Sequence, residues 1–260
     1  MTDKRGRPVL TREWLDERLE LFERYCLPSV AYQTEQRFVW LVLLDEATDA
    51  ETVRRLEGHR TKVKQLALVY LPIVRNRATL ARPVVERAGP EPGLLVTTRL
   101  DNDDALHEEA LAEIRRHAVD RQGFLNLRLG FVTDGVRAQP VSLRHGPFLS
   151  LVEPRGPGRV RTVHGSPHTQ VARIAPVRQI ESQPLWLRVV HGRNVRNVAF
   201  EEQTARDIRS PRRLASRLRS RVVAAIQHPG GRGRPAATMP LDEIAAEFHI
   251  GEALPAATRR

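Results

Sequence analysis

The sequence predicts an α/β protein with an open, mostly parallel β-sheet flanked by helices and a basic, helical C-terminal tail. Three short apolar runs, at residues 38–44, 66–71 and 94–98, are typical of strands buried on both faces of such a sheet. Stretches of helical character alternate with them, at residues 14–27, 49–59 and 105–118. An open sheet of this kind binds its ligands at the carboxyl ends of its strands.

The first predicted element is a helix. Leu15, Leu19, Phe22 and Cys26 recur at helical spacing and give it one apolar face. Pro28 follows and is expected to end the helix, because proline lacks the backbone N–H that the next turn needs.

The predicted strands end in acidic residues. Asp45 and Glu46 close the first apolar run. The third run leads into an acidic cluster, which consists of Asp101, Asn102, Asp103 and Asp104. Because the carboxyl ends of parallel strands meet at one edge, we expect both sets at the ligand-binding edge of the sheet.

The second half of the chain changes character, with short β-like pieces between glycine, proline and polar turns. We expect edge strands and loops at residues 124–129, 131–136, 141–143, 148–152 and 159–163. Residues 203–235 hold nine arginines against one acid, and residues 211–226 within them predict an amphipathic helix. One last short helix is expected at residues 241–248. The sequence thus predicts a main domain over residues 1–200 and a basic helical extension over residues 201–260.

The composition limits partners and compartment. A net charge of +11 favours a phosphate-rich ligand, an anionic membrane surface or nucleic acid, without choosing among them. A single cysteine, Cys26, excludes an intramolecular disulfide and a cysteine-rich zinc site. No apolar run approaches the roughly 20 residues that span a bilayer, and the first residues lack the apolar stretch of a signal peptide. We expect a soluble, cytoplasmic protein.

The basic tail bears on the choice of partner. It lacks the aromatic side chains that stack on bases, which disfavours nucleic acid. Arginines beside an apolar stripe suit an anionic lipid surface better, so peripheral contact with the inner face of the membrane is one expectation. An ordinary solvated helix face is the other interpretation.

The acidic cluster is the candidate site. Hard divalent cations such as Mg²⁺ take carboxylate oxygens and share substrate phosphates, and a diphosphate needs such a cation to sit beside carboxylates. Asp101, Asp103 and Asp104 therefore predict a divalent cation together with a phosphate. The alternative is structural, because acidic residues also cap the N-terminus of a following helix.

Four segments carry a resemblance to a known family. They read LFERYCLPSVAYQT, FVWLVLLDEAT, TTRLDNDDALH and WLRVVHGRNVRN. Over about residues 14–197 the chain resembles the putative rhamnosyltransferase family of bacterial glycosyltransferases. The resemblance implies a GT-A-like fold that moves a sugar, such as rhamnose or another deoxyhexose, from a nucleoside-diphosphate sugar. The acceptor would be a carbohydrate, a lipid-linked molecule or a small molecule, bound among the short strands and loops of the second half.

The resemblance also implies roles for individual residues. Asp101 and Asp103 stand as the DxD pair that holds Mn²⁺ or Mg²⁺ and the donor diphosphate, with Asp104 as a helper or helix cap. His191 matches a further metal ligand that GT-A enzymes often supply from a later loop. Arg99 either pairs with the acids or holds a phosphate through its planar guanidinium.

The remaining roles are less determined. Asp45 lies where the donor nucleoside is expected, although it and Glu46 could equally cap the next helix. The resemblance implies a catalytic base within SPHTQ, where His168 stands in place of a carboxylate. Asp134 and Glu181 are alternative bases.

A further departure concerns the start of the chain. A GT-A domain opens with a strand that carries nucleotide contacts, yet residues 1–13 hold too few large aliphatics for a buried strand. We expect residues 1–13 to be irregular and the strand ending at Asp45 to lie beside a gap or groove. Either that first strand is absent or the protein starts upstream of this sequence. An alternative function follows, a non-catalytic relative that binds glycan, nucleotide or a partner protein.

Overall fold

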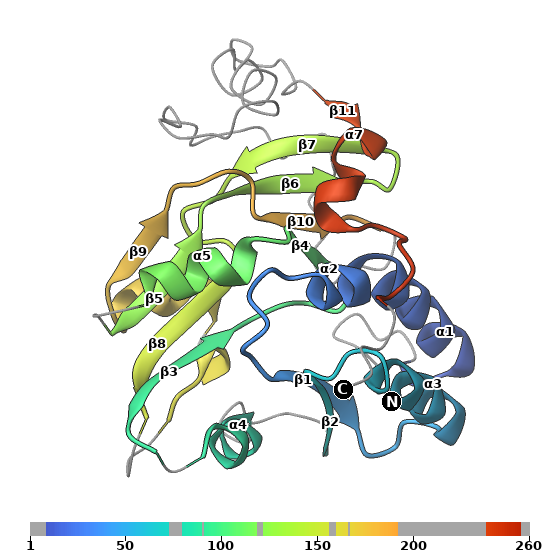
Figure 1. Cartoon of the computed structure of the whole chain (residues 1–260), viewed down its shortest axis with the longest axis horizontal. Helices are drawn as coiled ribbons and strands as arrows, with labels where there is room; N and C mark the ends of the chain where they lie inside the picture. The colour runs from blue at the N-terminus through green and yellow to red at the C-terminus, as the bar shows by residue number, and fades with distance from the viewer. Residues whose placement is uncertain are drawn as a thin grey trace.

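In the part of the chain that the structure describes, three β-sheets with helices packed around them make up a mixed α/β fold (Figure 1). The computed structural model describes residues 9–72, 80–89, 91–118, 122–155, 160–165, 167–191 and 238–255. Five of the eight strand pairings in these residues are antiparallel, so the expectation of a mostly parallel sheet is wrong. Among the helices so described, none is long and apolar enough to cross a membrane.

One long helical segment opens the described chain. Thr11 caps α1 (Arg12–Leu21), the π-helical turn η1 (Phe22–Cys26) follows, and α2 (Leu27–Ala31) completes the segment. Residues 9–11 are irregular, as expected, but the helix already begins at the next residue. The first eight residues of the same prediction lie outside the described part.

Pro28 lies inside this helical segment, so the prediction that it ends the helix is wrong. A proline has no N–H for the carbonyl four residues earlier, which here belongs to Arg24. The backbone N–H of Gly251, from the C-terminal part of the chain, donates to this carbonyl at 2.8 Å. A long-range hydrogen bond thus replaces the local one, and the helix continues through the proline.

A small parallel sheet follows the helical segment. β1 (Trp40–Asp45) pairs in parallel with β2 (Leu66–Leu71), and α3 (Ala50–Arg60), capped by Asp49, connects them. Among the described strands β1 pairs with β2 alone. Burial on both faces was predicted, but the side chain of Leu43 is 41% exposed because it faces an open groove.

The acidic cluster connects two strands. β3 (Gly93–Thr98) enters it and pairs antiparallel with β8 (Leu149–Arg155). The chain leaves it through β4 (Ala105–Leu106), which pairs antiparallel with β10 (Trp186–Val189). The helix predicted at residue 105 begins only at α5 (Ala110–His117), since strand pairing takes up the residues before it. The acidic cluster is therefore not at a helix N-terminus.

The short β-like pieces of the second half form the centre of the two larger sheets, not their edges. Their orders are β3-β8-β5-β9 and β11-β7-β6-β10-β4. Residues 160–162 are irregular and do not form the expected strand. The elements not yet given are α4 (Ala81–Ala88), β5 (Gly123–Leu127), β6 (Leu129–Thr133), β7 (Arg137–Ser142), β9 (Val177–Ile180), β11 (Met239–Pro240) and the 3₁₀-helices Val163–Gly165 and His168–Arg173.

The core between the sheets centres on Trp186. Its side chain is completely buried and stacks on Phe148, with ring centroids 4.6 Å apart. Its indole N–H donates to the carbonyl of Leu127 at 2.8 Å. Gly130 lies against the indole face, where a Cβ atom would overlap the ring. These contacts fix the start of β10.

The C-terminal part packs on the same body. α7 (Asp242–Ala245) and the 3₁₀-helix Ala246–Phe248 confirm the last predicted short helix, and the ring of Phe248 packs edge-on against Phe131 in the core. The amphipathic helix predicted at residues 211–226 lies outside the described residues.

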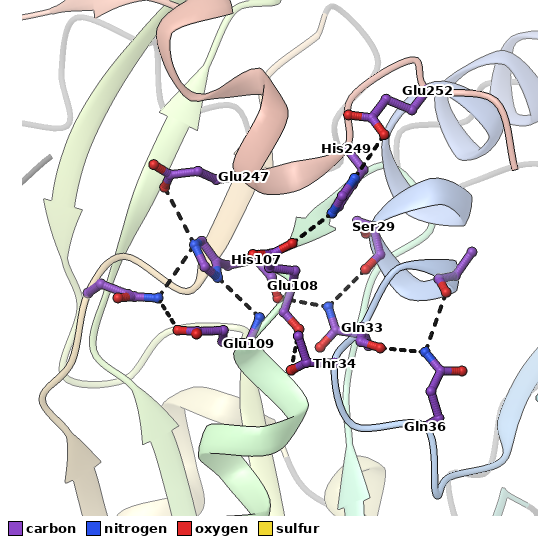
Figure 2. A network of polar contacts seen from close by, with 12 residues as sticks. Ser29, Gln33, Thr34, Gln36, His107, Glu108, Glu109, Glu247, His249 and Glu252 are labelled. Carbon is purple, nitrogen blue, oxygen red and sulfur yellow. Dashed lines mark hydrogen bonds and ion pairs between the residues drawn. The ribbon is translucent and has the colours of Figure 1, made fainter. Parts of the chain in front are cut away.

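Two histidines join this segment to the residues around β4, as Figure 2 shows. His249 lies between two carboxylates, with Nε2 at 3.1 Å from Glu108 and Nδ1 at 2.9 Å from Glu252. His107 faces Glu247, with 3.4 Å between Nε2 and the carboxylate. The C-terminal segment is thus held by polar contacts as well as by its apolar side chains.

Candidate functional site

A groove of about 1500 Å³ runs beside β1 and β3. Large apolar side chains of both strands line it while remaining 36–54% exposed: Val39 before β1, Leu43 in β1, and Leu94 and Val96 in β3. The groove beside the strand ending at Asp45 was predicted from the sequence and is confirmed. The acidic cluster lies along the same groove.

Asp103 is the centre of the acidic cluster. Its Oδ2 accepts a hydrogen bond from Nη1 of Arg18 at 3.1 Å and lies 2.9 Å from Nε2 of His191. The other terminal nitrogen of Arg18 donates to the side-chain oxygen of Asn102. The Asp103 side chain is only 9% exposed. A buried carboxylate needs such compensation, because burial without partners is costly.

Asp101 faces a different arginine. The guanidinium of Arg99 donates two parallel hydrogen bonds to its carboxylate, both at 3.0 Å. The Asp101 side chain is 44% exposed, so it remains accessible from the groove. Of the two roles predicted for Arg99, pairing with the acids is the one seen in this structure.

Asp104 connects the acidic cluster to β10. Its carboxylate accepts the backbone N–H of Val189 at 3.0 Å, two residues before His191. Burial, together with the charges of Asp103 and Asp101, raises the pKa of Asp104 well above its usual range. Asp104 therefore positions the histidine-bearing end of β10 and does not cap a helix.

The direction of the pKa shift distinguishes Asp103 from Asp104. Burial opposes its ionisation, but the hydrogen bond from His191 and the charge of Arg18 outweigh burial and lower the pKa of Asp103. A second arginine, Arg188, also interacts with Asp104 and Asp103. Burial lowers the pKa of its guanidinium, and the charges of these two acids oppose that shift. The pKa values of Asp103 and Asp104 are therefore shifted in opposite directions.

Asp103 and His191 are the two side chains of the site whose donor atoms lie close enough together to share a cation. Two ligands at adjacent positions of an octahedral Mg²⁺, with bonds of about 2.1 Å, lie about 3 Å apart. Asp103 Oδ2 and His191 Nε2 are 2.9 Å apart, a distance that the hydrogen bond between the two side chains already explains. No group of three or more His, Cys, Asp or Glu within the described residues is arranged to hold a metal ion. A cation held by these two side chains alone would need substrate phosphates and water for the rest of its coordination.

The other predicted site residues divide into two groups. Asp45 and His168 line the groove with the acidic cluster. Asp45 accepts the N–H of Ala47 at 2.8 Å, while Asp49 caps the next helix in its place. The alternative bases are engaged elsewhere and are not among the groove residues: Asp134 accepts N–H groups of its own turn, and Glu181 pairs with Arg128 at 2.5 Å.

Sequence reasoning missed Arg18 and Arg188, which bring positive charge to the acidic cluster. A signal for Arg18 was present. It stands three residues after Leu15 and one before Leu19, on the apolar side of the first helix, where a charge needs a buried partner. The 3₁₀-helical His164, close to His168 in the chain, also lines the groove and was not predicted.

The fold is mixed α/β, and the charged candidate site lies beside the groove, where β3 and β10 end. The chain belongs to the family described as "Putative rhamnosyl transferase", whose family model matches residues 2–203. That family name indicates a glycosyltransferase. Among curated proteins, none matches the chain.

Proposed function

We propose that this chain is a glycosyltransferase that uses a nucleoside-diphosphate sugar, rhamnose or another deoxyhexose, with a divalent cation. The observation that carries the proposal is the meeting of Asp103, His191 and Arg18 at a groove of about 1500 Å³. The family match over residues 2–203 supports sugar transfer as the chemistry.

The donor end of the site is assigned to the acidic cluster. Asp103 and His191 would hold Mn²⁺ or Mg²⁺, and the cation would neutralise the diphosphate as a leaving group. Asp101 is the other acid of the DxD pair, and its carboxylate accepts a hydrogen bond from Arg99. Asp45, at the end of β1 on the same groove, is assigned to the nucleoside side.

The acceptor end is assigned to the wall that carries His168. In an inverting transfer, the acceptor hydroxyl oxygen bonds to the anomeric carbon while the bond from that carbon to the diphosphate oxygen breaks. The electron pair leaves with the diphosphate, and the hydroxyl proton passes to the imidazole of His168. An imidazole suits this role because it titrates near neutral pH. The acceptor is a carbohydrate, a lipid-linked molecule or a small molecule.

Binding of nucleoside diphosphates with and without Mn²⁺ tests the proposal directly. We expect calorimetry to show metal-dependent binding by the wild type and its loss in Asp103→Asn, which keeps the shape but removes the charge. Asp101→Asn should weaken binding to a smaller degree. Asp16→Asn is the matched control. It makes the same chemical change in an acid that also pairs with an arginine, Arg12, but Asp16 is not among the residues that line the groove.

The outcomes separate enzyme from binding protein. Release of free nucleoside diphosphate from a matching donor, accelerated by an acceptor, would support transfer. Metal-dependent binding without turnover for any donor and acceptor would favour the non-catalytic alternative. Equal binding by the wild type and Asp103→Asn would contradict the assignment of the acidic cluster.

A further inference from the structure

Resting on the proposed function, we propose that the hydroxyl of Thr162 is a sugar-binding group, which forms a hydrogen bond with a hydroxyl of the sugar bound in the groove. Thr162 is only 3% exposed. Its Oγ1 is one of two buried side-chain polar atoms, within the part of the chain that the structure describes, that have no hydrogen-bond partner. Buried hydroxyl groups are normally paired, so this atom requires an explanation.

The position of Thr162 makes a ligand in the groove the candidate partner. Thr162 lines the same groove as His168 and the acidic cluster. The other unpaired atom, Nη2 of Arg128, belongs to a guanidinium that already pairs with Glu181, and Arg128 is not among the groove residues. The Thr162 hydroxyl is itself buried. Rotation about the Cα–Cβ bond exchanges a threonine hydroxyl with its methyl group, and such a rotation would turn the hydroxyl towards the groove.

The backbone at Thr162 has an unusual conformation that two strands hold in place. Its φ is 59°, in the left-handed region that a β-branched residue rarely adopts. The two carboxylate oxygens of Glu153 in β8 accept the N–H groups of Arg161 and Thr162, both at 2.9 Å. Oγ1 of Thr97 in β3 accepts the N–H of Val163 at 2.8 Å. Strained residues persist where their surroundings enforce them, and they cluster at ligand sites.

The chemistry of the Thr162 side chain matches a sugar hydroxyl. A threonine hydroxyl donates one hydrogen bond and accepts others, and an alcohol group does the same, so the two pair in either direction. The hydrogen bond removes the cost of an unpaired buried polar group, and this favours the complex. The proposed function supplies two sugars, one on the donor and one on the acceptor.

Thr162→Val should change stability and binding in opposite directions. The substitution replaces the hydroxyl with a methyl group of similar size and keeps the branch at Cβ. Removal of an unpaired buried hydroxyl should raise Tm by about 2–4 °C, as differential scanning fluorimetry would show. The same substitution should weaken binding of the sugar about three- to tenfold, because one hydrogen bond is lost.

Three further variants serve as controls. Thr97→Val makes the same chemical change in a hydroxyl that is paired, so it should lower Tm by about 2–4 °C. Thr61→Val removes a hydroxyl that donates to the carbonyl of Gly58 away from the groove, and it should leave sugar affinity unchanged. Thr162→Ser keeps the hydroxyl and should bind the sugar within about twofold of the wild type.

Calorimetry with three kinds of probe identifies the group that Thr162 contacts. The probes are thymidine and uridine diphosphate, the rhamnose esters of both, and free rhamnose. If Thr162→Val weakens binding of the esters but not of the free diphosphates, the hydroxyl contacts the donor sugar. If it weakens binding of rhamnose alone, the hydroxyl contacts the acceptor sugar. Weaker binding of the free diphosphates would assign the hydroxyl to phosphate and overturn the inference.

The remaining outcomes distinguish this inference from the proposed function. An unchanged or lower Tm for Thr162→Val would show that the hydroxyl already has a partner, such as a buried water molecule, and would contradict the inference. If Tm rises but the wild type and Thr162→Val bind every probe equally, Thr162 contacts no sugar and the proposed function stands. If the wild type binds none of the probes, the proposed function and this inference both fail.

Discussion

Replacing Gly130 with alanine tests how tightly the core sets the position of β10. An ideal Cβ at this residue would lie 2.5 Å from Cε3 of Trp186 and closer still to two other ring atoms. The indole has no room to retreat, since it is completely buried, stacked on Phe148 and hydrogen-bonded to the carbonyl of Leu127. We expect the substitution to move either the ring or β6.

The magnitude follows from the cost of overpacking. Extra methyl groups in a packed core typically lower the free energy of unfolding by 1–3 kcal/mol. Because the Trp186 ring is buried, stacked and hydrogen-bonded, we expect Gly130→Ala to lower it by about 3 kcal/mol or more. Gly58→Ala is the matched control. Gly58 lies inside α3 with nothing within 4 Å of its would-be Cβ, so alanine there should stabilise by about 0.5–1 kcal/mol.

Thermal unfolding measures both changes. In a chain of this size about 3 kcal/mol corresponds to a fall of roughly 6–12 °C in Tm for Gly130→Ala, against a small rise for Gly58→Ala. Because β10 leads to His191, Gly130→Ala should also weaken Mn²⁺ binding. A Tm within about 1 °C of the wild type for Gly130→Ala would refute the reasoning, since the ring would then have room to move.

Three other predictions concern single side chains. Burial opposes ionisation of Glu23, but hydrogen bonds from Arg55 and His59 lower its pKa, so Glu23 stabilises the folded state above its unfolded pKa and loses this effect as pH falls through the folded pKa. Glu23→Gln should therefore cost about 1 kcal/mol at pH 7, allowing for solvent screening, and progressively less as the pH falls through the folded pKa, as denaturant titrations over a series of acid pH values would show. Burial raises the pKa of the Cys26 thiol, so a thiol reagent should modify it only after unfolding; fast modification of the native protein would contradict its burial. His168→Ala should lower kcat by about 10²–10⁴ with donor affinity unchanged, and an unaltered kcat would remove His168 as the base.

Local sequence patterns predicted those helices and strands whose formation depends on residues close by in the chain. The bounds of β2 are those of the predicted run at residues 66–71, and α3 lies within a residue of its prediction. The failures arose where distant residues intervene. Pro28 lies inside a helix, where a π-helical turn precedes it and the distant Gly251 donates to the Arg24 carbonyl, and residue 105 enters a strand because β10 pairs with it. Neither partner is visible in the local pattern.

The sequence predicted the acidic residues of the candidate site better than the arginines that pair with them. Asp103 and His191 lie far apart in the sequence, and their proximity followed from the family resemblance, not from spacing. Arg18 could have been found as a charge on an apolar helix face, but its target could not, because 85 residues separate it from Asp103. The groove beside β1 was predicted, but the apolar run at residues 94–98 did not show that β3 lines the same groove.

The bond between the N–H of Gly251 and the carbonyl of Arg24 has a consequence for biosynthesis. A ribosome makes the helix that carries Arg18 early, but residue 251 emerges only after more than two hundred further residues. Until then the Arg24 carbonyl lacks the N–H donor of Gly251. Tyr25 also lacks the apolar side chains of Ile244 and Phe248, which share its core cluster. Contacts so distant in sequence form slowly, because the loop between them must close first. We therefore expect the nascent chain to depend on chaperones until residues 244–251 have emerged, although the candidate site lies entirely before residue 192.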